Sequence, residues 1–100
     1  MVSALTFASG KGIVKIQGIV MTVDVKKQII TVNERSFACN QHTVVYNEKG
    51  LPTTFDKLKL RGWVYIEGVS DKNRGNIAAK IYIIPKYIDE KEKHLYSFME

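Results

Sequence analysis

The residues best suited to metal or nucleophilic chemistry are a cysteine and a histidine at C-x-x-H spacing. Cys39 and His42 form this pair, and His94 is the one further histidine. A structural zinc site takes four cysteine or histidine ligands, and this chain has one cysteine and two histidines in all. A buried thiol in a strand is inert without an activating base, and nothing near this pair would orient the imidazole. We therefore expect Cys39 in the core, His42 in a loop and no metal site.

Carboxylates and glycines give no stronger indication of catalysis. Asp24, Asp56 and Asp71 stand at positions that suit turns or caps, and none faces a second carboxylate in an acid–base pair. The stretch SGKG at 9–12 lacks the first glycine and the following Ser/Thr of a phosphate-binding loop. The sequence therefore favours a protein that is not an enzyme and needs no cofactor.

The segment RGWVYIEG at 61–68 alternates aromatic and aliphatic side chains. In a strand, Trp63 and Tyr65 point to one face, and Val64 and Ile66 point to the other. The segment IAAKIYII at 77–84 is expected to pair with this strand. The expected neighbours are Val64 with Ile81, Ile66 with Ala79, Trp63 with Tyr82, and Tyr65 with Lys80. The first face is aliphatic and the second carries charge, so the aliphatic face is predicted to line the core.

Trp63, Tyr65 and Tyr82 are thus predicted to form one outward cluster. An exposed apolar patch is unusual in a monomer, so something must cover or use it. The tail contains apolar residues that can fold back over the cluster, namely Ile88, Leu95, Tyr96 and Phe98. Alternatively the cluster binds a protein, since Trp and Tyr are enriched at binding hot spots. The tail is slightly favoured as the cover, and the candidate partner-binding residues are Trp63, Tyr65, Lys80 and Tyr82.

The elements that position these residues are mostly strands. Residues 12–25 are rich in β-branched side chains and predict a long strand that bends at Gly18 and serves two sheet layers. Residues 28–33 and 35–39 predict a hairpin with a two-residue turn at Asn33-Glu34. The expected pairs are Ile30 with Phe37, Val32 with Arg35, Ile29 with Ala38, and Thr31 with Ser36. Residues 42–47 continue extended, and 53–60 predict one or two helical turns.

Five strands in this order, with a short helix between the third and fourth, predict an all-β, OB-like Greek-key barrel. We expect a flexible N-terminus at 1–12, the barrel at 13–85, and a tail at 86–100 that packs on the barrel or on a partner. Near-helical spacing of its apolar residues leaves open whether the tail is a helix. The predicted core residues are Val14, Ile16, Val20, Ile30, Val32, Phe37, Val45, Leu58, Val64, Ile66, Ala79, Ile81 and Ile83.

The charge distribution offers an alternative function. The net charge is +5; residues 1–85 carry 12 basic and 6 acidic groups, a net of +6, which suits an anionic partner. OB folds bind single-stranded nucleic acid across the outer face of their second and third strands, flanked by loops that are basic here. The candidate residues in those loops are Lys26, Lys27, Lys72 and Arg74. The predicted outer face has no aromatic side chain for base stacking, so protein contacts are favoured and nucleic-acid binding is the alternative.

The pattern resembles a family of small bacterial OB-like barrel domains of unknown function. The matching positions are Gly18, Asp24, IITVN at 29–33, Thr43, TFDKLK at 54–59, GWVYIEG at 62–68 and IAAKI at 77–81. The resemblance covers about residues 13–84 and implies the fold without transferring any site. It also mildly implies association with the bacterial envelope. From the residues themselves we expect a non-enzymatic binding or adaptor module that acts through protein contacts. No apolar run approaches the roughly 20 residues of a membrane span, and both the envelope or periplasm and the cytoplasm stay open.

Overall fold

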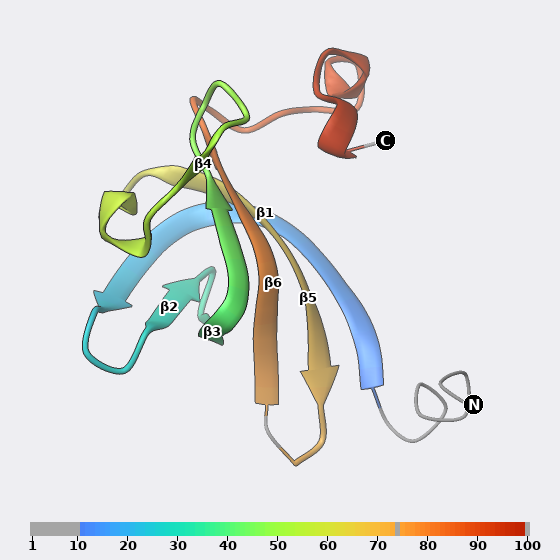
Figure 1. Cartoon of the computed structure of the whole chain (residues 1–100). Coiled ribbons are helices and arrows are strands. Elements are labelled where there is room, and N and C mark those ends of the chain that lie inside the picture. Colours follow the sequence, from blue (N-terminus) through green and yellow to red (C-terminus); the bar gives the residue numbers. More distant parts are fainter. Residues whose placement is uncertain (1–10, 74, 100) are drawn as a thin grey trace.

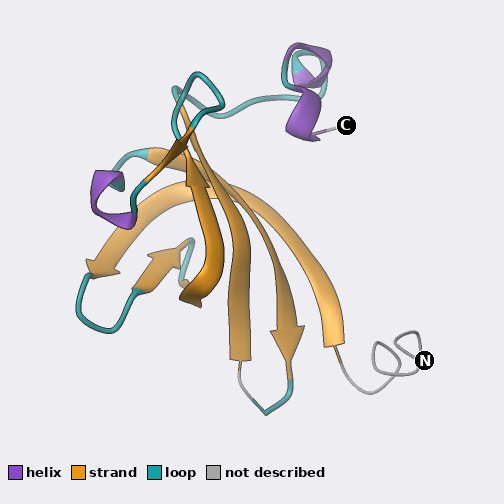
Figure 2. Cartoon of the chain, viewed as in Figure 1, coloured by secondary structure: helices purple, strands orange, loops and turns teal. Residues whose placement is uncertain are grey.

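Nearly all regular structure in this protein is β-strand (Figure 2). The computed structural model describes residues 11–73 and 75–99. Its strands are β1 (Lys11–Asp24), β2 (Ile29–Val32), β3 (Arg35–Tyr46), β4 (Pro52–Thr53), β5 (Trp63–Asp71) and β6 (Gly75–Ile84). Three short 3₁₀ turns complete the set: η1 (Phe55–Lys57), η2 (Lys93–Leu95) and η3 (Ser97–Met99). Within the described residues, no helix is long and apolar enough to cross a membrane.

Five of the strands close into a barrel. β1 pairs with β2, β2 with β3, β5 with β6 and β5 with β1, all antiparallel. The parallel pair of β3 and β6 closes the ring, and the short β4 adds to the edge of β3 (Figure 1). The turn η1 lies between the third and fourth barrel strands. This arrangement confirms the all-β, OB-like barrel expected from the sequence.

The long first strand serves both sides of the barrel, as predicted. β1 pairs with β5 as far as Ile19 and with β2 from Val20 onward, and it curves across the back of the sheet (Figure 1). Gly18 lies just before this change of partner, opposite Val64 of β5. A Cβ there would stand 2.5 Å from Cγ1 of Val32 and 2.6 Å from the side chain of Asn33. Only glycine therefore lets the β2–β3 hairpin approach β1 so closely.

The predicted β2–β3 hairpin is also confirmed. Asn33 and Glu34 have φ angles of 50° and 67°, as both central residues of a type I′ turn require. The four pairs form as expected: Ile30 with Phe37, Val32 with Arg35, Ile29 with Ala38, and Thr31 with Ser36. This register places Ile30, Val32 and Phe37 in the core, all with no measurable exposure.

The register of β5 with β6 differs from the prediction by two residues. Tyr65 lies opposite Tyr82, and the neighbouring pairs are Trp63 with Ile84, Val64 with Ile83, and Ile66 with Ile81. One residue of the shift arises at the turn, where Asp71 lies opposite Gly75, and one from a bulge at Glu67 and Gly68. A shift of two keeps every side chain on its predicted face, because successive side chains alternate.

The bulge explains why the prediction of Ala79 as a core residue is wrong. Ala78 lies opposite Gly68 and is buried, whereas Ala79 is exposed. A Cβ on Gly68 would overlap the carbonyl oxygen of Ile77, so the bulge needs glycine at this point. The buried core comprises Val20, Ile30, Val32, Phe37, Val45, Leu58, Val64, Ile66, Ala78 and Ile81. Val14, Ile16 and Ile83 pack against it, partly buried, so the remaining predicted core residues are confirmed.

Candidate functional site

The predicted partner-binding residues lie on one outward face of the β5–β6 pair. Trp63, Tyr65 and Tyr82 point away from the core, and Lys80 lies opposite Glu67 on the same face. The sequence therefore predicted the grouping correctly. Tyr65 and Tyr82 retain only 6% and 9% of their accessible surface, which agrees with the slightly favoured expectation that the tail covers them. Whether these residues bind a partner stays a prediction.

The tail covers this face and forms a second apolar cluster with it. Tyr82 lies between two rings, with centroids 4.7 Å from Tyr46 and 4.0 Å from Phe98, and it is nearly parallel to both. Phe98 also packs on Tyr65, at 5.7 Å. Burial, with a smaller contribution from the nearby Glu67 carboxylate, raises the pKa of both Tyr65 and Tyr82. In this chain the outer aromatic face is thus a packed surface.

Polar contacts hold the start of the tail. The side-chain amide of Gln17 on β1 donates to the carbonyl oxygen of Ile88 and accepts from its N–H, each at 2.7 Å. Lys86 pairs with Glu92 at 2.9 Å across the first turn of the tail, and this contact raises the pKa of Lys86 and lowers that of Glu92. The near-helical spacing predicted for the tail appears only as the 3₁₀ turns η2 and η3.

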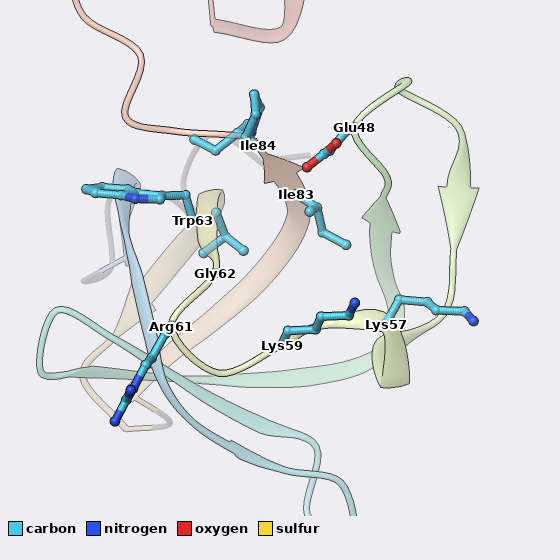
Figure 3. A pocket seen from close by; sticks show the side chains of 10 residues that line it. Glu48, Lys57, Lys59, Arg61, Gly62, Trp63, Ile83 and Ile84 are labelled. Carbon is cyan, nitrogen blue, oxygen red and sulfur yellow. The ribbon is translucent and has the colours of Figure 1, made fainter.

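Two predicted site residues remain accessible on the outer face. Lys80 is exposed, and Trp63 is half-buried in a T-shaped contact with Tyr87, with the ring centroids 5.8 Å apart. Trp63 also lines a hollow that the sequence reasoning missed, with a volume of about 300 Å³ at one end of the barrel (Figure 3). Its lining residues are Glu48, Lys57, Lys59, Arg61, Gly62, Trp63, Val64, Ile83, Ile84 and Pro85. We call this hollow the Trp63 groove.

The segment KLKLR at 57–61 forms the basic rim of the Trp63 groove. Its alternation of cations and leucines immediately before Trp63 is the signal that could have indicated it. Leu58 is buried in the core, so Lys57 and Lys59 remain on the outside. The loop is held by the N–H of Arg61, which donates to the carbonyl of Val20 at 2.8 Å. Arg61 has a φ of 68°, a conformation that turns the chain sharply into β5.

In Figure 3, the side chains around the Trp63 groove divide into a floor and a rim. Ile83 and Ile84 lie between Trp63 and Glu48, and Lys59 extends beneath Ile83. Arg61 and Lys57 extend from opposite sides of the loop. The arrangement can hold a large apolar group against the Trp63 ring with anionic groups beside it.

The candidate nucleic-acid residues are placed on separate turns. Lys26 and Lys27 lie in the exposed β1–β2 turn, and Lys72 lies in the exposed β5–β6 turn. Arg74 lies outside the described residues. On the outer face of the β2–β3 hairpin, the hydroxyls of Thr31 and Ser36 are 3.1 Å apart, and the paired residues 29–32 and 35–38 place no aromatic side chain there. Tyr46, at the far end of β3, is stacked on Tyr82. The hairpin part of this face therefore offers bases no ring on which to stack, and Tyr46 is already engaged within the chain.

The two residues of the C-x-x-H pair lie in different surroundings. Cys39 packs at the edge of the core, and burial raises the pKa of its thiol to about 11. His42 is exposed, and its backbone N–H donates to the side chain of Asn40. Across residues 11–73 and 75–99, no cluster of three or more His, Cys, Asp or Glu side chains could hold a metal ion.

Known proteins were compared with the chain at the level of sequence and of structure. No family model matches it, and no curated protein shows significant sequence similarity to it. A solved structure has a similar fold. It is the crystal structure of the fimbrial biogenesis protein PilY2 from Pseudomonas aeruginosa, with a TM-score of 0.56 and 22% sequence identity. The match covers 72% of this chain and 87% of PilY2. This likeness supports the small barrel fold that the sequence resemblance implied.

Proposed function

We propose that this protein is a non-enzymatic, OB-like binding module that acts through protein contacts in an assembly of the bacterial envelope. The observation that carries the proposal is the Trp63 groove, which joins a half-buried tryptophan to a rim of lysine and arginine. PilY2 is named a fimbrial biogenesis protein, and its similar fold supports an envelope assembly role for this chain.

The composition of the Trp63 groove suits a protein partner. Trp and Arg are enriched at binding hot spots, where an aromatic anchor is surrounded by polar groups that exclude water. Trp63 and Lys80 contact the partner directly in this proposal, because both are accessible. Tyr65 and Tyr82 act from beneath the tail, where they support the surface on which Tyr87 and Trp63 meet.

Site-specific photo-crosslinking tests the proposal. A photoreactive phenylalanine analogue replaces Lys59 at the Trp63 groove, or Lys26 on the distant β1–β2 turn as a control, in cells of the native organism. We expect discrete protein adducts at position 59 that disappear when Trp63→Ala is added, and none at position 26. Adducts at neither position, or equal adducts at both, would contradict the proposal.

Single-stranded nucleic acid is the competing ligand, and a titration separates it. The probe is a fluorescent oligothymidylate of about 12 nucleotides, within the size range that OB folds cover. We expect only weak binding that vanishes at moderate salt, because charge without stacking gives salt-sensitive attraction. Binding that survives moderate salt and depends on the four candidate cations would reverse the ranking of the two functions. These are Lys26, Lys27, Lys72 and Arg74.

A further inference from the structure

We infer that the Trp63 groove binds an extended acidic segment of a protein partner, with one large apolar side chain of that segment seated against the Trp63 ring. The inference rests on the proposed function and names the chemistry of the partner. Three features of the groove support it: the charge of its rim, its size, and its continuation along the protein surface.

The rim of the Trp63 groove is basic. Lys57, Lys59 and Arg61 line the groove, and Glu48 is its one carboxylate. The ion pairs formed within the described part of the chain are Lys86–Glu92 and Lys93–Glu90, both in the tail. Among the described residues, the cations of the groove therefore have no carboxylate within ion-pair distance. An acidic segment would supply one, and complementary charge would speed its association.

The floor of the groove selects an apolar anchor. Trp63, Ile83 and Ile84 line it, and its volume of about 300 Å³ stands at the lower end of the range for small-molecule pockets. That volume suits one large side chain rather than a cofactor. Tyr87 packs edge-on against Trp63, so the ring is already oriented before a partner arrives. Such preorganisation reduces the entropy lost on binding.

Two further hollows extend the Trp63 groove along the β3–β4 loop. The first, of about 510 Å³, shares Glu48, Lys59 and Ile83 with it and adds Lys49 and Leu51. The second, of about 240 Å³, shares Glu48 and Lys49 with the first and reaches the tail at Leu95, Tyr96 and Phe98. Leu51 and Leu95 are 56% and 67% exposed along this path. Lysines and exposed leucines thus line a continuous path, with Glu48 as its one carboxylate. Such a path fits an extended chain that contains both acidic and apolar residues better than a compact ligand.

The same features disfavour a nucleic-acid strand. Successive bases of a single strand need successive aromatic side chains on which to stack. Trp63 is the one aromatic side chain that lines the Trp63 groove, and its ring is already in a T-shaped contact with Tyr87. At the far end of the path, Phe98 is stacked on Tyr82 and so is engaged within the chain.

Peptide titration of the full chain tests the inference. The probes are three fluorescent peptides of equal length: one alternating glutamate with leucine and phenylalanine, one of glutamate and serine, and one alternating lysine with leucine and phenylalanine. Binding is followed by anisotropy and by the emission of Trp63, the one tryptophan of the chain. We expect the first peptide to bind most tightly and to change the Trp63 emission at physiological salt.

Charge reversal provides the matched comparison. We expect Lys57→Glu with Lys59→Glu to weaken binding of the acidic–apolar peptide at least about tenfold, since each lost charge contact typically lowers affinity severalfold. Lys26→Glu with Lys27→Glu makes the same change in net charge at another exposed site and should leave binding within about twofold. Thermal unfolding of both double variants shows whether the fold is kept. If the groove variant does not fold, Trp63→Phe in its place should also weaken the binding, because it reshapes the floor.

Three outcomes would overturn the inference: no binding of the acidic–apolar peptide, equal binding of the basic peptide, or equal loss in both double variants. The inference would also be overturned if the oligothymidylate bound at the Trp63 groove more tightly than the acidic–apolar peptide does. If crosslinking at position 59 still captures a protein, the proposed function stands and only the acidic segment is wrong. If crosslinking fails as well, both fall.

Discussion

The side-chain amide of Gln17 and the backbone of Ile88 form two reciprocal hydrogen bonds of 2.7 Å across 71 positions of sequence. An amide has one donor group and one acceptor, and here a single peptide unit of the tail satisfies both. Ile88 is fully buried, so water cannot replace these partners. The contact fixes where the tail leaves the barrel and begins to cover the outer aromatic face.

Removing this contact should loosen the tail. We expect Gln17→Leu to lower the free energy of unfolding by about 1–3 kcal/mol, because the N–H and C=O of Ile88 lose their partners in a buried setting. Chemical denaturation measures the loss, and hydrogen exchange at the Ile88 amide should become faster. Gln41→Leu changes an exposed glutamine and serves as the control. An Ile88 amide that stays equally protected in Gln17→Leu would contradict this account of the tail.

The stacking of Phe98 on Tyr82 predicts a stability cost for changes in the tail. Phe98→Ala should lower the free energy of unfolding by about 1–3 kcal/mol, because it re-exposes Tyr82 and Tyr65. Leu95→Ala, at a side chain that is 67% exposed, should cost far less. Deleting 86–100 should in addition shift Trp63 emission to longer wavelength, since Tyr87 is lost. Unchanged stability and emission after the deletion would mean that the tail does not cover this face in solution.

The close approach of the β2–β3 hairpin to β1 makes Gly18 sensitive to any side chain. Gly18→Ala places a Cβ 2.5 Å from Val32 and should cost about 1–3 kcal/mol, the usual range for overpacking a core. Gly12→Ala is the matched control in the same strand, because a Cβ there has no heavy atom within 4 Å. Thermal unfolding of the two variants gives the comparison. Equal effects would show that β1 does not bend against the hairpin as described.

The thiol of Cys39 should react slowly in the folded protein. Burial raises its pKa from 9.0 to about 11, so at pH 8 the thiolate fraction is about a hundredfold lower than in an unfolded chain. Iodoacetamide labelling, with and without denaturant, measures the difference. The raised pKa also sets the sign of the pH dependence: its contribution to stability is complete below pH 9 and is lost as the pH rises through about 11. Rapid labelling of the native chain at pH 8 would place Cys39 in a more exposed position than described.

Local patterns in the sequence were sufficient to predict the barrel and to predict which side chains of its strands face the core. The alternation at 61–68 determined that Val64 and Ile66 line the core and that Trp63 and Tyr65 point outward, since successive strand residues alternate. The turn at Asn33-Glu34 determined the β2–β3 register, because the two strands are adjacent in sequence and a two-residue turn allows one pairing.

Contacts between distant segments were decided only by the tertiary structure. The bulge at Gly68 exchanged Ala79 for Ala78 in the core, because it depends on how β5 fits between β1 and β6. The Trp63 groove joins Glu48, the basic loop before β5 and the end of β6, which meet only when the barrel closes. The contact that anchors the tail joins residues 17 and 88 through one side-chain amide. No periodicity in either segment indicates that these two residues are partners. Side-chain alternation is a property of one strand, whereas a groove or an anchor depends on which elements the closed barrel brings together.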